Sequence, residues 1–196
     1  MCGFFVIKDK ILDNAKANKA LNKILHRGPD NSKNLIHDNI FFGFNRLSIQ
    51  DLSSNADQPM VKNFDNKKII ILFNGEIYNF KEIKKNDPKI SNINFTSSSD
   101  TEVLLNLYIS YGFEKMLQKI EGMFSICIYD EIKKKIFLAR DHFGQKPLYY
   151  YLNDTTLAVS SEIKSITTYI DNFKPDFKAS LYPLFCQLLP TRPKTM

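Results

Sequence analysis

The chain has 196 residues, of which 43% are hydrophobic and 24% charged, and its net charge is +6. These proportions are those of a folded globular protein and exclude a disordered chain, which has fewer apolar residues. No apolar run approaches the length of about 18 residues that a membrane-spanning helix needs. The first ten residues also lack the basic start and long apolar stretch of a signal peptide. We therefore expect a cytoplasmic protein with no membrane partner.

The positive charge comes from 23 Lys and only four Arg. Lys runs at 67–68, 84–85 and 133–135 are typical of a solvated surface, whereas a nucleic-acid surface mixes Arg and aromatic residues with Lys. The three Cys and three His are scattered, without the spacing of a disulfide framework or a zinc site. We expect no nucleic-acid partner and no metal.

Hydrophobic periodicity predicts both strands and helices in the first half of the chain. The predicted elements are a strand over 2–8, a helix over 11–25, strands over 39–49 and 68–73, and a short helix over 77–85. A turn cluster at 27–30 ends the first helix, and the polar stretch 51–59 separates the next two strands. Asn74-Gly75 is expected to end the strand over 68–73, because this dipeptide is common in turns.

The second half begins with a helix that carries its own start signal. Ser99 and Glu102 have the spacing of a capping box, and the helix over 100–111 is expected to end at Gly112. A half-buried strand follows at 124–129, where apolar and smaller or polar residues alternate. The remaining predicted elements are strands over 135–140, 147–152 and 156–160 and a helix over 162–170.

About seven strands result, and most neighbouring strands are joined by connections too short for a crossover helix. This pattern predicts an α+β architecture, in which antiparallel sheets are covered by helices.

Cys2 is the first candidate for chemistry. If Met1 is removed, this single residue carries both a thiol and a free α-amine. The two groups titrate within about one pH unit of each other, so the amine can accept the thiol proton without a His. With Met1 retained, the nitrogen is an amide and the base is lost. The alternative is a small apolar residue in an edge strand.

Three further positions could complete a site for acyl transfer. The Asn74 side chain and the Gly75 N–H could form an oxyanion hole, with a plain turn as the alternative. Asp100, in the first helical turn, could bind a substrate ammonium as a carboxylate held anionic by the helix dipole, with simple capping as the alternative. Arg46 could bind a carboxylate, or be a surface residue at a strand end. We interpret Arg140-Asp141 as a structural ion pair.

Taken together, these groups suit a small α-amino acid that bears a cleavable carbonyl. Eight segments then occur in the order found in one protein family. They are Cys2-Gly3, HRGPD at 26–30, RLSI at 46–49, NGEIYN at 74–79, SDTE at 99–102, EGMF at 121–124, RDHFGQKPLYY at 140–150 and SEIK at 161–164. The chain thus resembles the glutaminase domain of class II glutamine amidotransferases. RGPD, RLSI and NGEIYN resemble the branch of glutamine-hydrolysing asparagine synthetases.

The resemblance implies an N-terminal-nucleophile hydrolase fold, a four-layer α/β/β/α sandwich of two antiparallel sheets. It implies that Cys2 attacks the glutamine carboxamide with its own amine as base, and that Asn74 and Gly75 bind the oxyanion. Arg46 is expected to bind the glutamine α-carboxylate. The α-amino end is assigned to Asp100 and Glu76 together with backbone groups of Leu47, Ser48, Ile49 and Gln50. Gln50 departs from the family, which has an aliphatic residue there.

The implied function is hydrolysis of glutamine through a Cys2 thioester, which supplies ammonia for asparagine synthesis from aspartate, glutamine and ATP. The chain lacks the Ser-Gly-Gly-x-Asp-Ser type pyrophosphate loop of the family's synthetase domain. We therefore expect a fragment or split gene product, with an amidotransferase domain over 1–170 and the start of a connection over 171–196. No cofactor is expected in this chain, while ATP and Mg²⁺ belong to the missing domain.

The expected partners are glutamine and the absent C-terminal synthetase domain. An apolar stripe in the tail should dock on that domain: Leu181, Leu184, Phe185, Leu188 and Leu189. A homodimer is a further possible assembly. Two other functions are alternatives: ammonia supply to another acceptor, such as a sugar carboxylate of a surface polysaccharide, and a catalytically silent interaction module.

Overall fold

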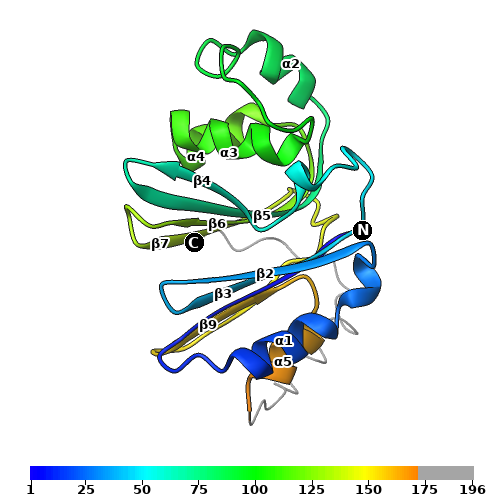
Figure 1. The fold of residues 1–196 in the computed structure, drawn as a ribbon, viewed down its shortest axis with the longest axis vertical. Helices are drawn as coiled ribbons and strands as arrows, with labels where there is room; N and C mark the ends of the chain where they lie inside the picture. Colours follow the sequence, from blue (N-terminus) through cyan, green and yellow to red (C-terminus); the bar gives the residue numbers. More distant parts are fainter. Residues whose placement is uncertain (172–196) are drawn as a thin grey trace, which may run out of the picture.

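The computed structural model describes residues 1–171. In that range two antiparallel β-sheets are stacked face to face, with helices on both outer sides (Figure 1). The first half contains β1 (Gly3–Asp9), α1 (Asn14–Asn22), η1 (Leu25–Arg27), β2 (Asn31–His37), β3 (Ile40–Arg46), η2 (Ser54–Ala56), β4 (Met60–Phe64), β5 (Lys67–Ile77) and α2 (Phe80–Asn86). The second half contains α3 (Asp100–Tyr111), α4 (Phe113–Lys119), β6 (Gly122–Asp130), β7 (Lys135–Arg140), β8 (Tyr149–Leu152), β9 (Thr156–Ser160) and α5 (Ile163–Tyr169).

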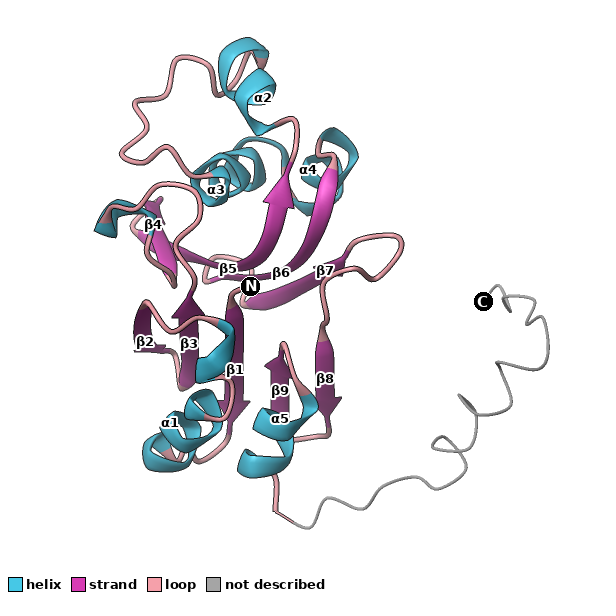
Figure 2. Cartoon of the chain, turned by 90° about the vertical axis from the view of Figure 1, so that its right-hand side faces the viewer, coloured by secondary structure: helices cyan, strands magenta, loops and turns pink. Residues whose placement is uncertain are grey.

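The strand order places the N-terminal strand in the middle of one sheet. The five-stranded sheet has the order β2-β3-β1-β9-β8 and the four-stranded sheet the order β4-β5-β6-β7. All neighbouring strands are antiparallel, and Phe5 of β1 lies opposite Gly43 of β3 and Ser160 of β9. The N-terminus lies at one end of the sandwich, between the two sheets (Figures 1 and 2).

Three apolar cores separate four layers. Phe42, Leu72 and Tyr129 belong to the central core between the two sheets. A second core packs β5 and β6 against α3 and α4, and a third packs β1 and β3 against α1 and α5. Strand β6 is therefore buried on both faces, and not half-buried as its alternation predicted. Cys127 and Tyr129 face the other sheet, while Phe124, Ile126 and Ile128 face the helices.

The described residues contain nine strands, two more than the sequence predicted. The additional ones, β2 and β4, are edge strands. Both are rich in polar residues and half-buried at most over most of their length, so neither carries the apolar signal of an interior strand.

Strand β5 runs through Asn74 and Gly75 to Ile77, so the prediction that this dipeptide ends the strand is wrong. Asn74 lies opposite Ser125 and Gly75 opposite Phe124 in a continuous ladder with β6. The alternative of a plain turn is wrong for the same reason. Pairing with a neighbouring strand outweighs the local turn preference of Asn-Gly.

The helices match their predictions closely, with two differences. Helix α3 spans 100–111 as predicted, and the Ser99 Oγ accepts a bond from the Glu102 N–H at 3.4 Å. The Glu102 carboxylate does not complete a capping box, since it accepts from Thr96 and Ser97 instead. Gly112, with φ of 79°, makes the corner to α4, a helix that the sequence did not predict.

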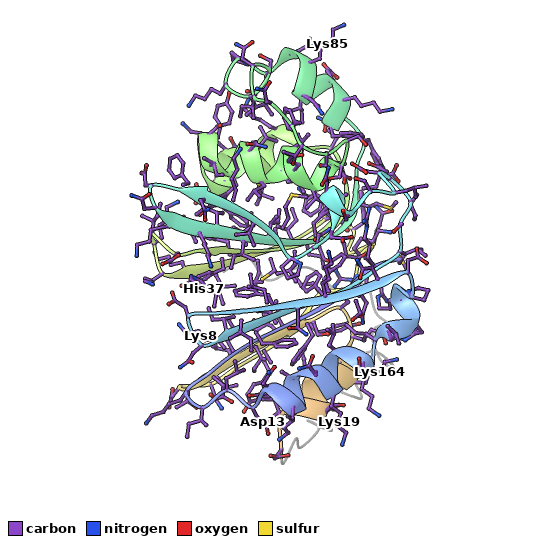
Figure 3. All side chains as sticks on the ribbon, viewed as in Figure 1. Lys8, Asp13, Lys19, His37, Lys85 and Lys164 are labelled. Atoms are coloured by element: carbon purple, nitrogen blue, oxygen red, sulfur yellow. The ribbon has the colours of Figure 1, made fainter. Side chains whose placement is uncertain are left out.

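The exposed lysines labelled in Figure 3 lie on different layers, with Lys85 on α2 at one end of the molecule and Lys164 on α5 toward the other. Among the described residues, no helix combines the length and apolarity that crossing a bilayer requires. The connection predicted over 171–196 and its apolar stripe lie outside the described residues, apart from residue 171.

Candidate active site

A cavity of about 120 Å³ opens at the end of the sandwich where the N-terminus lies. Six regions form it: the first residues of the chain, the end of β3 with the following loop, the C-terminal half of β5, the start of α3, the start of β6, and the loop between β7 and β8. Its lining includes Met1, Cys2, Arg46, Leu47, Ile49, Gln50, Gln58, Asn74, Gly75, Glu76, Asp100 and Lys146. The structure therefore brings together residues separated by up to 145 positions in the chain.

Cys2 lies at the cavity with its thiol against the backbone of Leu47. The Leu47 N–H donates to Sγ at 3.4 Å, and the thiol donates to the Leu47 carbonyl at 3.5 Å. Burial raises the pKa of the Cys2 thiol, while the Leu47 N–H and the nearby positive charges act in the opposite direction. The thiol is thus protonated at neutral pH, and a reaction at sulfur needs a base.

Met1 is present in the structure and lines the same cavity. Its Sδ accepts a bond from the Lys146 Nζ at 3.3 Å, and the Lys146 side chain is otherwise buried. No role is predicted for Lys146 from the sequence, although the residue lies within the segment 140–150. Only the folded chain shows that this lysine reaches the N-terminus.

Asn74 lines the cavity and carries a hydrogen-bond donor that is unpaired within residues 1–171. Its side chain is 2% exposed, and Nδ2 has no partner among the described residues. Unpaired buried donors are rare and cost about 1–3 kcal/mol. A donor left open beside a nucleophile is the arrangement that stabilises an oxyanion.

Gly75 follows Asn74 where β5 and β6 approach closely. A Cβ at this position would lie 2.2 Å from the Met123 carbonyl oxygen and 2.8 Å from the Phe124 Cα, both in the backbone of β6. Only glycine fits there, so the close pairing of β5 and β6 beside Asn74 depends on Gly75, which also lines the cavity.

Arg46 lies in the cavity wall with part of its guanidinium already bonded. Nη1 donates to the Ser53 carbonyl at 2.8 Å and to the Asp57 carboxylate at 2.6 Å, and Nη2 donates to the Asp51 carbonyl. A guanidinium has five N–H donors, so the Nε–H and one Nη2 hydrogen remain. Two donors suffice for a bidentate contact with a carboxylate.

Asp100 is 5% exposed and accepts a bond from the Ile77 N–H at 3.0 Å. Burial and, to a lesser extent, the negative charge of Glu76 raise its pKa to about 6, against the lowering effect of the Ile77 and Thr101 N–H groups. Desolvation therefore outweighs the helix N-terminus that is predicted to hold Asp100 anionic, although the carboxylate stays anionic at neutral pH. The group is anionic above pH 6 and neutral below it.

Ser48 is the one predicted site residue that does not line the cavity. Its N–H donates to the Asp30 carboxylate at 2.7 Å, outside the lining. Leu47, Ile49, Gln50 and Glu76 lie in the lining as expected.

Arg140 and Asp141 are structural but do not pair with each other. Arg140 donates to the carbonyls of Gly144 and Lys146, and Asp141 accepts from the N–H groups of Phe124, Gln145 and Lys146. Burial alone would raise the Asp141 pKa, but these N–H groups lower it. The interpretation as an ion pair is wrong; both residues instead shape the loop that carries Lys146 to the cavity.

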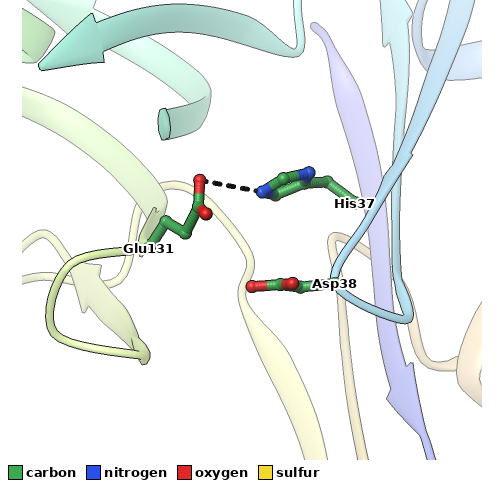
Figure 4. A group of neighbouring side chains, drawn as sticks. All are labelled: His37, Asp38 and Glu131. Carbon is green, nitrogen blue, oxygen red and sulfur yellow. Dashed lines mark hydrogen bonds and ion pairs between the residues drawn. The ribbon is translucent and has the colours of Figure 1, made fainter. Parts of the chain in front are cut away.

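A second cluster of ionisable groups lies far from the N-terminus. His37, Asp38 and Glu131 have ligand atoms within 4.8 Å of one another, and His37 Nε2 lies 3.0 Å from a Glu131 oxygen (Figure 4). Lys134 donates to Asp38 at 2.6 Å and Lys67 to Glu131 at 3.3 Å. These ammonium groups already compensate the carboxylates, and the cluster connects the β2–β3 turn to the residue after β6.

The fold and the cavity together define an amidotransferase of the N-terminal-nucleophile type. Over residues 1–196 the chain matches the family described as the glutamine amidotransferase domain, and it belongs to that family. The glutamine phosphoribosylpyrophosphate amidotransferase of B. subtilis superposes with a TM-score of 0.72 at 19% identity, covering 86% of this chain and 43% of that one. This match confirms the predicted four-layer fold.

Its relatives by sequence are longer proteins. The chain is 40% identical over 177 residues to a putative glutamine-hydrolysing asparagine synthetase 2 of Methanocaldococcus jannaschii, covering 82% of this chain and 32% of that protein. It is 35% identical over 202 residues to asparagine synthetase 1 of Bacillus subtilis, covering 100% of this chain and 31% of the relative. The chain therefore spans about a third of the length of these relatives, and the predicted family branch is confirmed.

Proposed function

We propose that this domain hydrolyses glutamine to glutamate and ammonia through a thioester on Cys2. The observation that carries the proposal is the open Asn74 Nδ2 donor in the cavity that also holds the Cys2 thiol. The buried thiol is a weak nucleophile as it stands, so its activation requires a base within reach.

Removal of Met1 supplies that base. The freed α-amine of Cys2 takes the thiol proton, and Sγ attacks the carboxamide carbon of glutamine. Asn74 Nδ2 and the Gly75 N–H stabilise the oxyanion of the tetrahedral intermediate. As the intermediate collapses, the C–N bond breaks, and the proton held by the amine moves to the leaving nitrogen, which departs as ammonia. Water then attacks the thioester, and glutamate is released as the Cys2 thiol is restored.

The two ends of glutamine match the charges of the cavity wall. The remaining donors of Arg46 suit the α-carboxylate, and the carboxylates of Asp100 and Glu76 suit the α-ammonium. Neither end changes charge during the reaction, so these contacts act in substrate and transition state alike.

In the longer proteins, we propose, the ammonia is consumed in asparagine synthesis by a separate synthetase domain that uses ATP and Mg²⁺. The support is the match to relatives named as glutamine-hydrolysing asparagine synthetases, of which this chain spans the smaller part. The direct test is to combine this chain with such a synthetase domain and to measure asparagine formed from aspartate, ATP and glutamine. Asparagine formation should require Cys2.

The glutaminase step can be tested on this chain alone. The mature protein, shown by mass spectrometry to lack Met1, should release glutamate from glutamine without ATP. Cys2→Ala should abolish release. A variant with a tag fused before Met1 should also be inactive, whereas the same tag after Met196 should have little effect. A mature chain that releases no glutamate above background would favour the catalytically silent module.

A further inference from the structure

Two glutamine side chains line the cavity, and they differ in how their amides are used. Gln58 is 7% exposed and fully bonded. Its Nε2 donates to the Phe73 carbonyl at 3.1 Å and to the Thr101 hydroxyl at 3.2 Å, and its Oε1 accepts from the Phe73 N–H at 2.6 Å. The amide of Gln58 therefore holds β5 and α3 in place.

Gln50 is bonded at one end only. Its Nε2 donates to the Glu76 carboxylate at 3.4 Å. An ionised carboxylate can only accept hydrogen bonds, so the amide nitrogen of Gln50 must face Glu76. The amide oxygen, Oε1, is then the atom available to another donor. In residues 1–171 this oxygen is buried and has no hydrogen-bond partner. A buried acceptor without a partner is a rare feature, and in a cavity wall it points to a donor on a ligand.

The surroundings of Gln50 specify the charge of that donor. Glu76 is the hydrogen-bond partner of Gln50, and its negative charge also acts on Asp100. Both carboxylates line the cavity together with Gln50. This part of the wall thus presents three acceptor groups, which is the number of N–H donors on a primary ammonium.

We propose that Gln50 is a specificity-determining residue of this cavity, and that its Oε1 accepts a hydrogen bond from the α-ammonium of the substrate. The amide nitrogen at the same time holds the Glu76 carboxylate toward that ammonium. An aliphatic side chain at this position would offer no such acceptor. The inference rests on the proposed glutaminase function, because it takes the ligand to be an α-amino acid.

Binding measured without turnover tests the role of Gln50 separately from the reaction. In the mature chain carrying Cys2→Ala, isothermal titration gives the Kd of L-glutamine and of 4-carbamoylbutanoate, which is glutamine without its α-ammonium. Gln50→Met keeps the length of the side chain and removes both amide groups. It should weaken glutamine binding by about tenfold or more, since a hydrogen bond to a charged group is lost. The Kd of 4-carbamoylbutanoate should change by less than about twofold.

Gln58→Met is the matched control for damage to the fold. It should lower the melting temperature, because three bonds to Phe73 and Thr101 are lost, whereas Gln50→Met should leave it nearly unchanged. The inference is overturned if Gln50→Met leaves the Kd of glutamine unchanged, if it weakens both ligands equally, or if the parent chain binds no glutamine. A parent chain that binds glutamine, and whose Cys2 form does not hydrolyse it, would contradict the proposed function and not the role of Gln50.

Discussion

At the scale of single residues, the Nδ2 donor of Asn74 should affect the rate of the reaction and not the binding of glutamine. The oxyanion exists only in the tetrahedral intermediate, so this amide should contribute little to the binding of glutamine. We predict that Asn74→Ala lowers kcat by about 10²–10³ with little change in KM. Because Nδ2 bonds to no described residue, the melting temperature should change little. Steady-state kinetics on the mature chain measure both constants; a raised KM with an unchanged kcat would remove Asn74 from the oxyanion hole.

Arg46 should behave in the opposite way. The α-carboxylate proposed to bind its two remaining donors keeps its charge throughout the reaction, so Arg46→Ala should chiefly raise KM, by about tenfold or more. Its other three donors hold Asp51, Ser53 and Asp57, so the same variant should also unfold at a lower temperature. An unchanged KM in a folded variant would exclude Arg46 from carboxylate binding.

The raised pKa of Asp100 predicts how glutamine hydrolysis depends on pH. Binding of the α-ammonium requires the anionic carboxylate, and burial places its pKa at about 6. The value of kcat/KM should therefore fall about tenfold for each pH unit below 6. Asp100→Asn should raise KM and flatten this part of the profile. A wild-type profile without an inflection between pH 5 and 7, measured with saturating and limiting glutamine, would contradict the assignment.

The same pKa has a consequence for stability. The ordinary pKa of the group is 3.8 and burial raises it to about 6, so between these values the folded chain holds a proton that the unfolded chain has lost. The contribution of Asp100 to the free energy of unfolding should thus fall as pH rises from about 4 to 6 and stay constant above. Asp100→Asn should be more stable than wild type at pH 7.5, by about 1–3 kcal/mol, and no more stable at pH 4. Urea unfolding at the two pH values measures the difference.

At the scale of elements, the close contact of β5 and β6 at Gly75 carries the site. A methyl group there would meet two backbone atoms of β6, neither of which can move alone. We predict that Gly75→Ala separates the strands and lowers the melting temperature by about 10 °C or more, or prevents folding, since a contact this close to backbone should cost at least the roughly 3 kcal/mol at the top of the overpacking range, at about 2–4 °C per kcal/mol. Gly112→Ala is the comparison: its Cβ meets nothing within 4 Å, and only the backbone conformation, φ 79° and ψ 175°, costs about 1–3 kcal/mol. Equal stabilities of the two variants would contradict the argument.

The strands and helices also show which structural elements can be predicted from the sequence. Strands with a clear apolar pattern and helices with a cap follow from periodicity, which is why β7, β9 and α3 have the predicted bounds, even though β7 is an edge strand. Edge strands β2 and β4 carry polar residues that resemble loops, and pairing alone makes them strands. Asn74-Gly75 has a strong local turn preference that the neighbouring strand overrides.

For the site, ordered motifs identified the residues that carry charge or a nucleophile, such as Cys2, Arg46 and Asp100. They could not identify Gln58 or Lys146. Both residues depend on hydrogen-bond partners that only the tertiary structure brings near. The partner of Gln58 is the Phe73 backbone, and the partner of Lys146 is Met1. The raised pKa of Asp100 is likewise a result of burial, which a capping motif does not reveal.

At the scale of the whole molecule, the four layers depend on the central core, because this core packs the two sheets face to face. Cys127 lies within it at 0% exposure, opposite Leu72 on β5. Burial raises the pKa of its thiol to about 12. A reagent can reach Cys127 only when the sheets separate, so this thiol reports on opening of the entire sandwich.

Thiol labelling should therefore distinguish the two described cysteines. In a Cys186→Ser background, iodoacetamide should modify Cys2 in the folded protein, faster as pH rises because its thiol is protonated at neutral pH. Cys127 should react only through unfolding, at a rate that increases with urea in proportion to the global unfolding equilibrium. Peptide mass spectrometry after timed quenching follows both sites, and Cys2→Ala isolates the signal of Cys127. Modification of Cys127 at a rate independent of urea would show that the sheets separate locally, and that the central core does not hold the two halves as one cooperative unit.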